Sequence, residues 1–202
     1  MEPGAGRHGR SNIARLTPSE RQRLLGLMPL PLARGTYDLD VTHSQIGFTV
    51  LHLGLTPVRG LFAEFSGQLT VGDTADESEL EVTIGLPSLQ SSHPGREEHL
   101  QGEDFFHSAQ HPQMSFRSTR IEGAEAAWTV TGDLSLRGVT RPVTIDTRMT
   151  GRALFPLDQK EHIGFVASGV LSRTAFGVAP NVPSMMLSDD ITVELAVQLI
   201  LQ

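Results

Sequence analysis

The 202-residue sequence contains no cysteine, so disulfide bonds and thiolate metal sites are excluded. Aromatic residues are also few: there is one Trp and one Tyr, and nine Phe supply most of the aromatic character. Phenylalanine has no polar group and can therefore face a space that offers no hydrogen-bond partner. The aromatic side chains that are present thus suit an apolar interior.

Positive charge is scarce, because 16 Lys and Arg face 23 Asp and Glu and give a net charge of -7. Phosphate backbones are bound by basic surfaces, so we expect no nucleic-acid partner. No apolar run approaches the roughly 20 residues that span a bilayer, so stable membrane insertion is not expected either.

An apolar stretch near the N-terminus, residues 24–33, has the sequence LLGLMPLPLA. Glu20 precedes it, and Pro29 and Pro31 interrupt it, which is unlike a secretion signal. We therefore expect a cytoplasmic protein. Secretion is the alternative, if this arm acts as an atypical signal.

Alternation of apolar and polar side chains is the main pattern in the sequence. Residues 128–149, WTVTGDLSLRGVTRPVTIDTRM, alternate along two arms that are separated by Gly138 and Pro142. A period of two is typical of half-buried β-strands. Similar segments recur from Thr36 to Leu201 with mostly short turns, apart from an irregular stretch at residues 91–113. The predicted fold class is all-β: an antiparallel up-and-down β-barrel of about eight strands with a short helical insertion.

The N-terminal region predicts a separate arm. Residues 1–12 are rich in Gly and Arg without an apolar pattern, and we expect them to be disordered. Thr17-Pro18-Ser19-Glu20 indicates a helix start, with Thr17 as the cap and Glu20 closing a capping box. We divide the chain into an arm, residues 1–34, and a barrel domain, residues 35–202. The helix either docks on the barrel surface or covers one end of it.

The interior of such a barrel is either filled by side chains or holds one small ligand. Small residues on the apolar faces, among them Gly67, Gly132 and Ala167, and the near absence of charge there favour a dry cavity. Alternation does not reveal volume, so a filled core or a packed sandwich stays open as the alternative.

Several ordered motifs make the chain from about Gly35 onward resemble a known family. They are YDLDVTHSQIGFTVLHLG at 37–54, REEHLQGEDFF at 96–106, HPQMSFRST at 111–119, TGDLSLRGVTRPV at 131–143, LSRTAFGV at 171–178 and SDDITVEL at 188–195. This set resembles the YceI-like family of polyisoprenoid-binding proteins, which have a lipocalin-like barrel. One departure is Arg96-Glu97, where the family usually has Arg-Asp.

The resemblance implies non-catalytic binding, storage or transport of a long-chain isoprenoid lipid, such as a polyprenyl phosphate or an isoprenoid quinone. The tail would lie inside the barrel and the head group toward its mouth. No cofactor is implied besides the bound lipid. A homodimer is possible, because long barrel strands are exposed.

The candidate ligand-binding residues are of three kinds, and core packing is the alternative for the apolar ones. Apolar side chains on alternating faces are candidates for the cavity wall: Phe48, Val50, Leu61, Phe65, Phe116, Val130, Leu134, Leu136 and Phe165. Aromatic residues outside the strands are candidates for plugging a barrel end or touching the ligand: Phe105, Phe106 and Phe176. Polar candidates for the head group are His52, Arg96, His99 and Arg173. The alternative for His52 is a buried histidine with its hydrogen bonds satisfied. The alternative for Arg96, His99 and Arg173 is a structural role, in which they bond the insertion to the strand ends.

Other functions find less support. His93, His99, His107 and His111 invite a metal site, but Pro112 argues against the helix that would align His107 with His111, and we expect no metal. No nucleophile elbow, phosphate-binding loop or dinucleotide fingerprint is present, and we expect no catalytic residue. The alternatives are an enzyme acting on a quinone or prenyl substrate in the same barrel, for which only His52 is a plausible interior group, and a scaffold that binds a partner protein.

Overall fold

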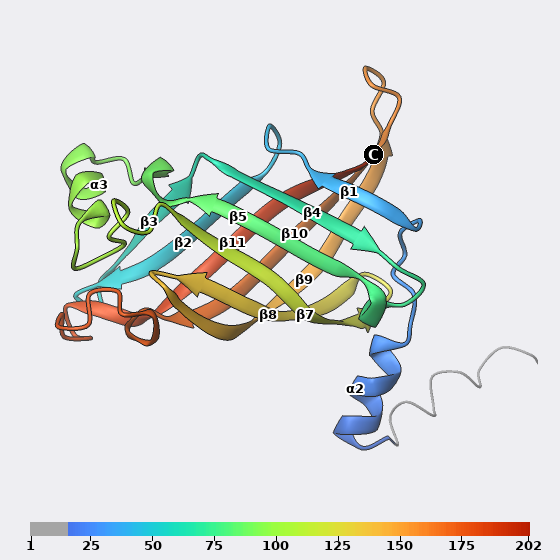
Figure 1. Ribbon diagram of the computed structural model, residues 1–202, viewed down its shortest axis with the longest axis horizontal. Coiled ribbons are helices and arrows are strands. Elements are labelled where there is room, and N and C mark those ends of the chain that lie inside the picture. Colours follow the sequence, from blue (N-terminus) through green and yellow to red (C-terminus); the bar gives the residue numbers. More distant parts are fainter. Residues whose placement is uncertain (1–15) are drawn as a thin grey trace, which may run out of the picture.

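A computed structural model describes residues 16–202 and shows an elongated β-barrel with a helix near each end (Figure 1). The prediction for residues 1–12 lies outside this range. The strands are β1 (Gly35–Leu39), β2 (Gln45–His52), β3 (Thr56–Phe62), β4 (Phe65–Val71), β5 (Glu79–Gly85), β6 (Leu89–Gln90), β7 (Gln113–Ala124), β8 (Ala127–Leu136), β9 (Val139–Leu154), β10 (Glu161–Ser172) and β11 (Leu187–Leu201). The helices are α2 (Pro18–Gly26) and α3 (Pro94–Gln101), with short 3₁₀ turns η1 (Ala75–Glu77), η2 (Leu86–Ser88) and η3 (Thr174–Phe176).

The strands pair antiparallel in the order β1-β4-β5-β7-β8-β9-β10-β11-β2-β3-β6, and β1 also pairs with β11. β1 and β2 lie end to end along β11, and β3 and β4 lie end to end beside them. β5 and β6 continue each other in the same way. The eleven segments therefore form eight strand lines, each beside its neighbours in sequence, and the β1–β11 pairing closes the ring. The prediction of an up-and-down barrel of about eight strands is confirmed.

The break between β3 and β4 changes which residues face the interior: even-numbered residues face inward in β3 and odd-numbered residues face inward in β4. Ala63 and Glu64 stand between the two strands, and Ala63 N–H donates to the Ser88 carbonyl instead of continuing the ladder. Phe62 consequently faces the interior, whereas Leu61 is 45% exposed on the outer face. The prediction that Leu61 lines the cavity is wrong, because we read residues 57–71 as one uninterrupted strand and a shift of parity moves every side chain to the opposite face.

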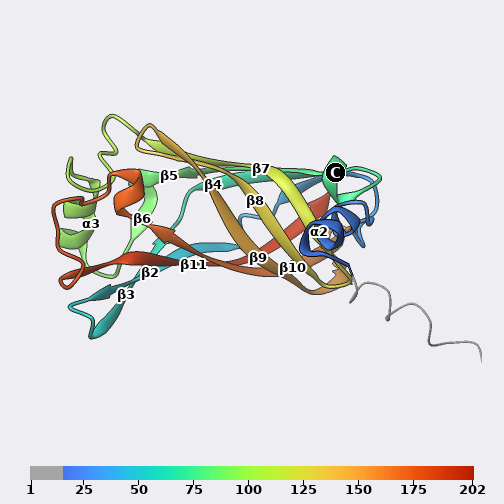
Figure 2. The ribbon, with the colours of Figure 1, turned by 90° about the horizontal axis from the view of Figure 1, so that it is seen from below.

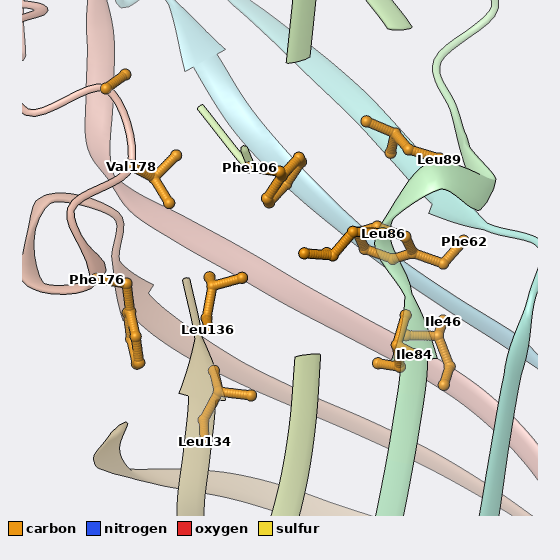
Figure 3. Close-up of a cluster of buried hydrophobic side chains, with 11 residues drawn as sticks. Ile46, Phe62, Ile84, Leu86, Leu89, Phe106, Leu134, Leu136, Phe176 and Val178 are labelled. Atoms are coloured by element: carbon orange, nitrogen blue, oxygen red, sulfur yellow. The ribbon is translucent and has the colours of Figure 1, made fainter. Parts of the chain in front are cut away.

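Two clusters of buried side chains occupy the two ends of the barrel. The α3-end cluster gathers side chains from opposite walls and from the loops around α3 (Figure 3). Its buried members are Ile46, Phe62, Ile84, Leu86, Leu89, Phe106, Leu134, Leu136, Phe176, Val178 and Ala179. The arm-end cluster comprises Tyr37, Leu69, Val71, Ala75, Ile121, Trp128, Val130, Ile163, Phe165 and Leu199.

The N-terminal arm begins as the sequence predicts and then covers one end of the barrel. Thr17 Oγ1 accepts a hydrogen bond from Glu20 N, and Glu20 Oε2 accepts one from Thr17 N at 2.9 Å, which completes the capping box. The segment after α2 is held to the barrel through its carbonyls: Ala75 N donates to Met28 O and the Tyr37 hydroxyl donates to Ala33 O, both at 2.9 Å. The arm is thereby fixed across the barrel end that Tyr37 closes.

Candidate functional site

A cavity of about 640 Å³ runs through the barrel between the two clusters. Its volume falls within the range of about 300–1,000 Å³ that is usual for small-molecule sites. Side chains on the concave face of β9 and β11 are only partly buried although they point inward. These partly buried wall residues are Val143, Ile145, Thr147, Ile191, Val193, Leu195 and Val197. Close packing would bury them, so they face unfilled space.

Most of the predicted wall residues do line this cavity. They are Phe48, Val50, Phe116, Val130, Leu134, Leu136 and Phe165, and the aromatic residues Phe105, Phe106 and Phe176 line it at the α3 end. Phe106 lies between the walls, with its ring centroid 6.4 Å from that of Phe48 and 6.1 Å from that of Phe62. Figure 3 shows Phe106 and Phe176 approaching the same interior from different loops. These rings narrow the α3 end without filling the barrel.

Two predicted wall residues lie outside the cavity. Leu61 faces the exterior, as described above, and Phe65 packs against the α3-end cluster opposite Ile84 without lining the cavity. Phe65 is therefore a core residue here, which is the alternative that the sequence left open.

Other wall residues were not singled out from the sequence. Val143, Ile145 and the inward-facing residues of β11 alternate as clearly as the candidates do, but alternation does not mark which inward side chains border unfilled space. Leu30, Pro31 and Leu32 also line the cavity at the arm end. No local pattern reveals these three, because their position depends on how the arm docks. They make the segment after α2 part of the cavity wall, whereas α2 itself docks on the barrel surface against β7 and η1.

The polar side chains of the cavity wall are concentrated at the α3 end. His52, Arg59, Ser91, Arg96, His99, Ser172 and Arg173 line this end, and among the lining residues only Thr147 has a polar side chain elsewhere. His52 is exposed at the edge, at the last position of β2, so the interpretation of a buried histidine is wrong. We call the α3 end of the cavity, where these groups meet solvent, its mouth.

Arg173 is 3% exposed and has a structural role at the mouth. Its Nε donates to Ser188 O at 3.1 Å, Nη1 donates to Val178 O and Ala179 O, and Nη2 donates to Val182 O and Leu187 O. All five N–H groups of a guanidinium are thus used. Because the partners are spread along residues 178–188, this one side chain fixes the loop between η3 and β11.

Arg96 and His99 are exposed on α3 and belong to a second anchored loop. Arg96 Nη1 donates to Ser91 O at 3.1 Å, and Ser91 N donates to Glu97 Oε1 at 2.5 Å. The Glu at the position where the family usually has Asp therefore closes the turn into α3. The His99 ring packs edge-on against Phe105, with centroids 4.8 Å apart. Arg96 thus bonds the insertion, His99 packs within it, and both border the cavity.

A titratable cluster lies outside the cavity at the base of the β9–β10 hairpin. His162 Nε2 is 2.9 Å from Asp158 Oδ2, and this hydrogen bond raises the pKa of His162 against the opposing effect of burial. The same bond lowers the pKa of Asp158. Burial raises the pKa of Asp40, but hydrogen bonds from His43 and from Thr42 N outweigh it and the net shift is downward. His162 Nδ1 lies 3.8 Å from Asp40 Oδ2, so the cluster joins the hairpin to the corner between β1 and β2.

Residues 16–202 contain neither a metal-binding cluster nor a membrane-spanning helix. Within that range no group of three His, Asp or Glu side chains could share a metal ion. His107 and His111 do approach each other, with ring centroids 5.8 Å apart, but without a third ligand. None of the helices in the same range has the length and apolar character needed to cross a bilayer.

A closed antiparallel barrel around an apolar cavity, polar only at one mouth, defines the class of hollow barrels with lipocalin-like architecture. The YceI-like domain family matches residues 37–199, so the chain belongs to the YceI-like family. A UPF0312 protein of Shewanella denitrificans is 37% identical over 158 residues, which cover 75% of this chain and 81% of that protein.

Solved structures show the same barrel. The YCEI protein of Campylobacter jejuni has a TM-score of 0.68 and 30% identity, and the match covers 75% of this chain and 90% of that one. A polyisoprenoid binding domain from Saccharophagus degradans has a TM-score of 0.61 and 15% identity, and the match covers 82% of this chain and 98% of that one. At the second identity the likeness is one of fold alone.

Proposed function

We propose that this protein binds the tail of a long-chain isoprenoid lipid in its cavity, without catalysis, for storage or transport. The observation that carries the proposal is the continuous apolar cavity of about 640 Å³, with its inward side chains facing unfilled space. The Saccharophagus degradans domain, which shares the barrel, is described as polyisoprenoid binding and supports the same ligand class. A branched hydrocarbon chain suits a wall of Phe, Leu, Ile and Val that offers few hydrogen-bond partners.

The free energy of binding would come mainly from the tail. Burial of one CH₂ group is worth about 0.8 kcal/mol, so a five-carbon unit contributes on the order of 3–4 kcal/mol before costs. An exposed ion pair between a head group and Arg96 contributes roughly 0–1 kcal/mol. Ordering a flexible chain offsets much of the gain, since affinities do not grow without limit. We therefore expect affinity to rise with tail length and to vary little with the head group.

The uneven distribution of polar groups gives the ligand a direction. Arg96, His99 and Arg59 border the α3 end, whereas Trp128, Phe165 and the arm residues Leu30 and Leu32 border the other end. The head group, a phosphate or a quinone, would lie at the mouth, and the end of the tail would lie beneath the arm.

A variant that fills the cavity tests the proposal. Ala167 on β10 lines the cavity, while its neighbour Val166 is 36% exposed on the outer face. Ala167→Phe should reduce retention of added polyprenyl phosphate and isoprenoid quinone in native mass spectrometry, most of all for the longest tails. Val166→Phe adds an aromatic ring on the opposite face and should leave retention unchanged. If wild-type protein retains neither lipid, or if Ala167→Phe binds all tail lengths like wild type, the proposal is wrong.

A further inference from the structure

Two uncharged segments lie side by side at the mouth of the cavity. Residues 51–58, LHLGLTPV, form the tip between β2 and β3, and residues 178–187, VAPNVPSMML, form the end of the loop that Arg173 holds. Leu53 N donates to Met186 O at 2.9 Å, so the two tips are joined. His52 is the one titratable side chain in the two segments, in a protein in which charged residues make up 19%. We call these two segments the neutral rim.

The neutral rim presents large apolar side chains to solvent. Leu55 is 79% exposed and Met185 is 80% exposed, and Leu51, Leu53 and Met186 are also exposed. The β2–β3 tip projects at the α3 end of the molecule in both views (Figures 1 and 2). His52 and Met186 belong to the cavity wall as well, so the rim is continuous with the mouth. Contiguous exposed apolar side chains of this kind mark an interaction surface.

We propose that the neutral rim docks onto a lipid bilayer and brings the cavity mouth to the membrane surface. The β2–β3 tip of the rim is narrow and projects from the barrel (Figure 2), and such a shape enters the fluid boundary between head groups and acyl chains without a complementary partner surface. The lack of charge on the tips avoids the cost of transferring ions into that boundary. Continuity with the mouth would place the opening of the cavity beside the bilayer surface, with the polar groups of the mouth at the level of the lipid head groups.

A comparison with the opposite end supports the choice of the rim. The tip between β9 and β10 also exposes Leu154 and Leu157, at 63% and 85%. Asp158 and Lys160 stand beside them, and Arg152 pairs with Glu161 at the base of the same hairpin. Charges therefore interrupt the apolar surface at that end and oppose its insertion. The two tips form a matched pair for an experiment, one neutral and one charged.

Vesicle flotation of the full chain tests the docking. We expect wild type to float with phosphatidylcholine vesicles, with or without added phosphatidylglycerol, and to stay bound at raised salt concentration. Leu55→Ser with Met185→Ser should weaken partitioning by at least about tenfold, because two large apolar side chains are lost from the contact. Leu154→Ser with Leu157→Ser, the control at the charged tip, should float like wild type.

Three results would overturn the proposal: wild type that does not float, a rim variant that floats like wild type, and a control variant that loses binding equally. Light scattering tests whether the rim instead binds a second copy of the chain. If wild type is a dimer that does not bind vesicles, and the rim variant is a monomer, the rim is a dimer interface and the docking proposal is wrong. Only the delivery of lipid to the cavity rests on the proposed function. Wild-type protein that floats with vesicles but retains no isoprenoid would contradict the proposed function and support membrane docking. A rim variant that no longer floats but still retains isoprenoid would show that lipid binding does not depend on docking.

Discussion

The ring of Phe48 lies over Gly60 on the inner wall of the barrel, and a Cβ atom added to Gly60 would stand 2.5 Å from Phe48 Cε1. The two residues are paired across β2 and β3. The contacts that such a Cβ would make, including one to Leu89 Cδ1 at 2.9 Å, are all to side chains. Gly60 thus provides the space in which Phe48 lies against the wall rather than across the cavity.

Gly60→Ala should push the Phe48 ring into the cavity and weaken lipid binding, most for the longest tails, because the usable volume falls. Titration with isoprenoid quinones of increasing tail length measures the effect. Gly47→Ala is the control for strand pairing: Gly47 lies on β2, and a Cβ there meets Leu61 Cδ2 at 2.7 Å on the outer face and the backbone oxygen of Gly60 at 3.0 Å. Equal loss of binding in both variants would point to disturbed strand pairing instead of a narrowed cavity.

Arg173→Lys should destabilise the fold by about 3 kcal/mol or more, because lysine cannot reach five carbonyls and unpaired buried acceptors each cost about 1–3 kcal/mol. Urea unfolding of the full chain measures this free energy. Arg96→Lys, at an exposed site with one bond to Ser91 O, should change it by less than about 1 kcal/mol. An Arg173→Lys protein with wild-type stability and altered head-group preference would instead make Arg173 a ligand contact.

The β9–β10 hairpin should be held most firmly at mildly acidic pH. The pKa of His162 is raised from 6.5, so its contribution is complete below that value and is lost as pH rises through the higher folded pKa. The pKa values of Asp158 and Asp40 are lowered from 3.8, so their contribution is complete above that value and is lost as pH falls through the lower folded pKa.

Hydrogen-exchange protection factors for residues 154–162 should accordingly be higher near pH 5 than near pH 8. His162→Gln keeps a polar side chain but cannot become protonated, and it should remove most of this difference. Protection factors that stay equal at the two pH values in wild type would show that the His162–Asp158 contact does not control the hairpin.

Removal of residues 1–34 should leave the β-barrel folded but open at the arm end, because Leu30, Pro31 and Leu32 belong to the cavity wall there. Circular dichroism should report unchanged β content, and bound lipid should dissociate faster than from the full chain. Removal of residues 1–15 alone keeps α2 and the docked segment and is the control. Loss of the β signal on removal of residues 1–34 would show that the barrel depends on the arm.

The alternation in the sequence predicted the strands and their sequential order, because side-chain direction follows directly from a period of two. It left the hollow open, and the family resemblance was needed to predict it, because alternation does not reveal volume. Most of the named candidates line the cavity, but they are only part of its wall. Prediction failed at Leu61, where a two-residue break at Ala63 and Glu64 reversed the parity. His52 was misjudged because the end of β2 lies at the mouth, where solvent replaces the core. The positions of Leu30 and Leu32 depend on tertiary docking alone, and no local pattern contains that information.

β11, the last strand, pairs with β10, β1 and β2 and so closes the ring. Its 15 residues follow all of the other strands in the chain. The hollow therefore comes into being only after β11 has been synthesised and paired, and until then the other strands form an open sheet with one apolar face. The pairing of β1 with β11 joins segments that are far apart in the sequence, so we expect closure of the barrel to be slow. The apolar face stays exposed until closure, and a chaperone would be needed most during that interval.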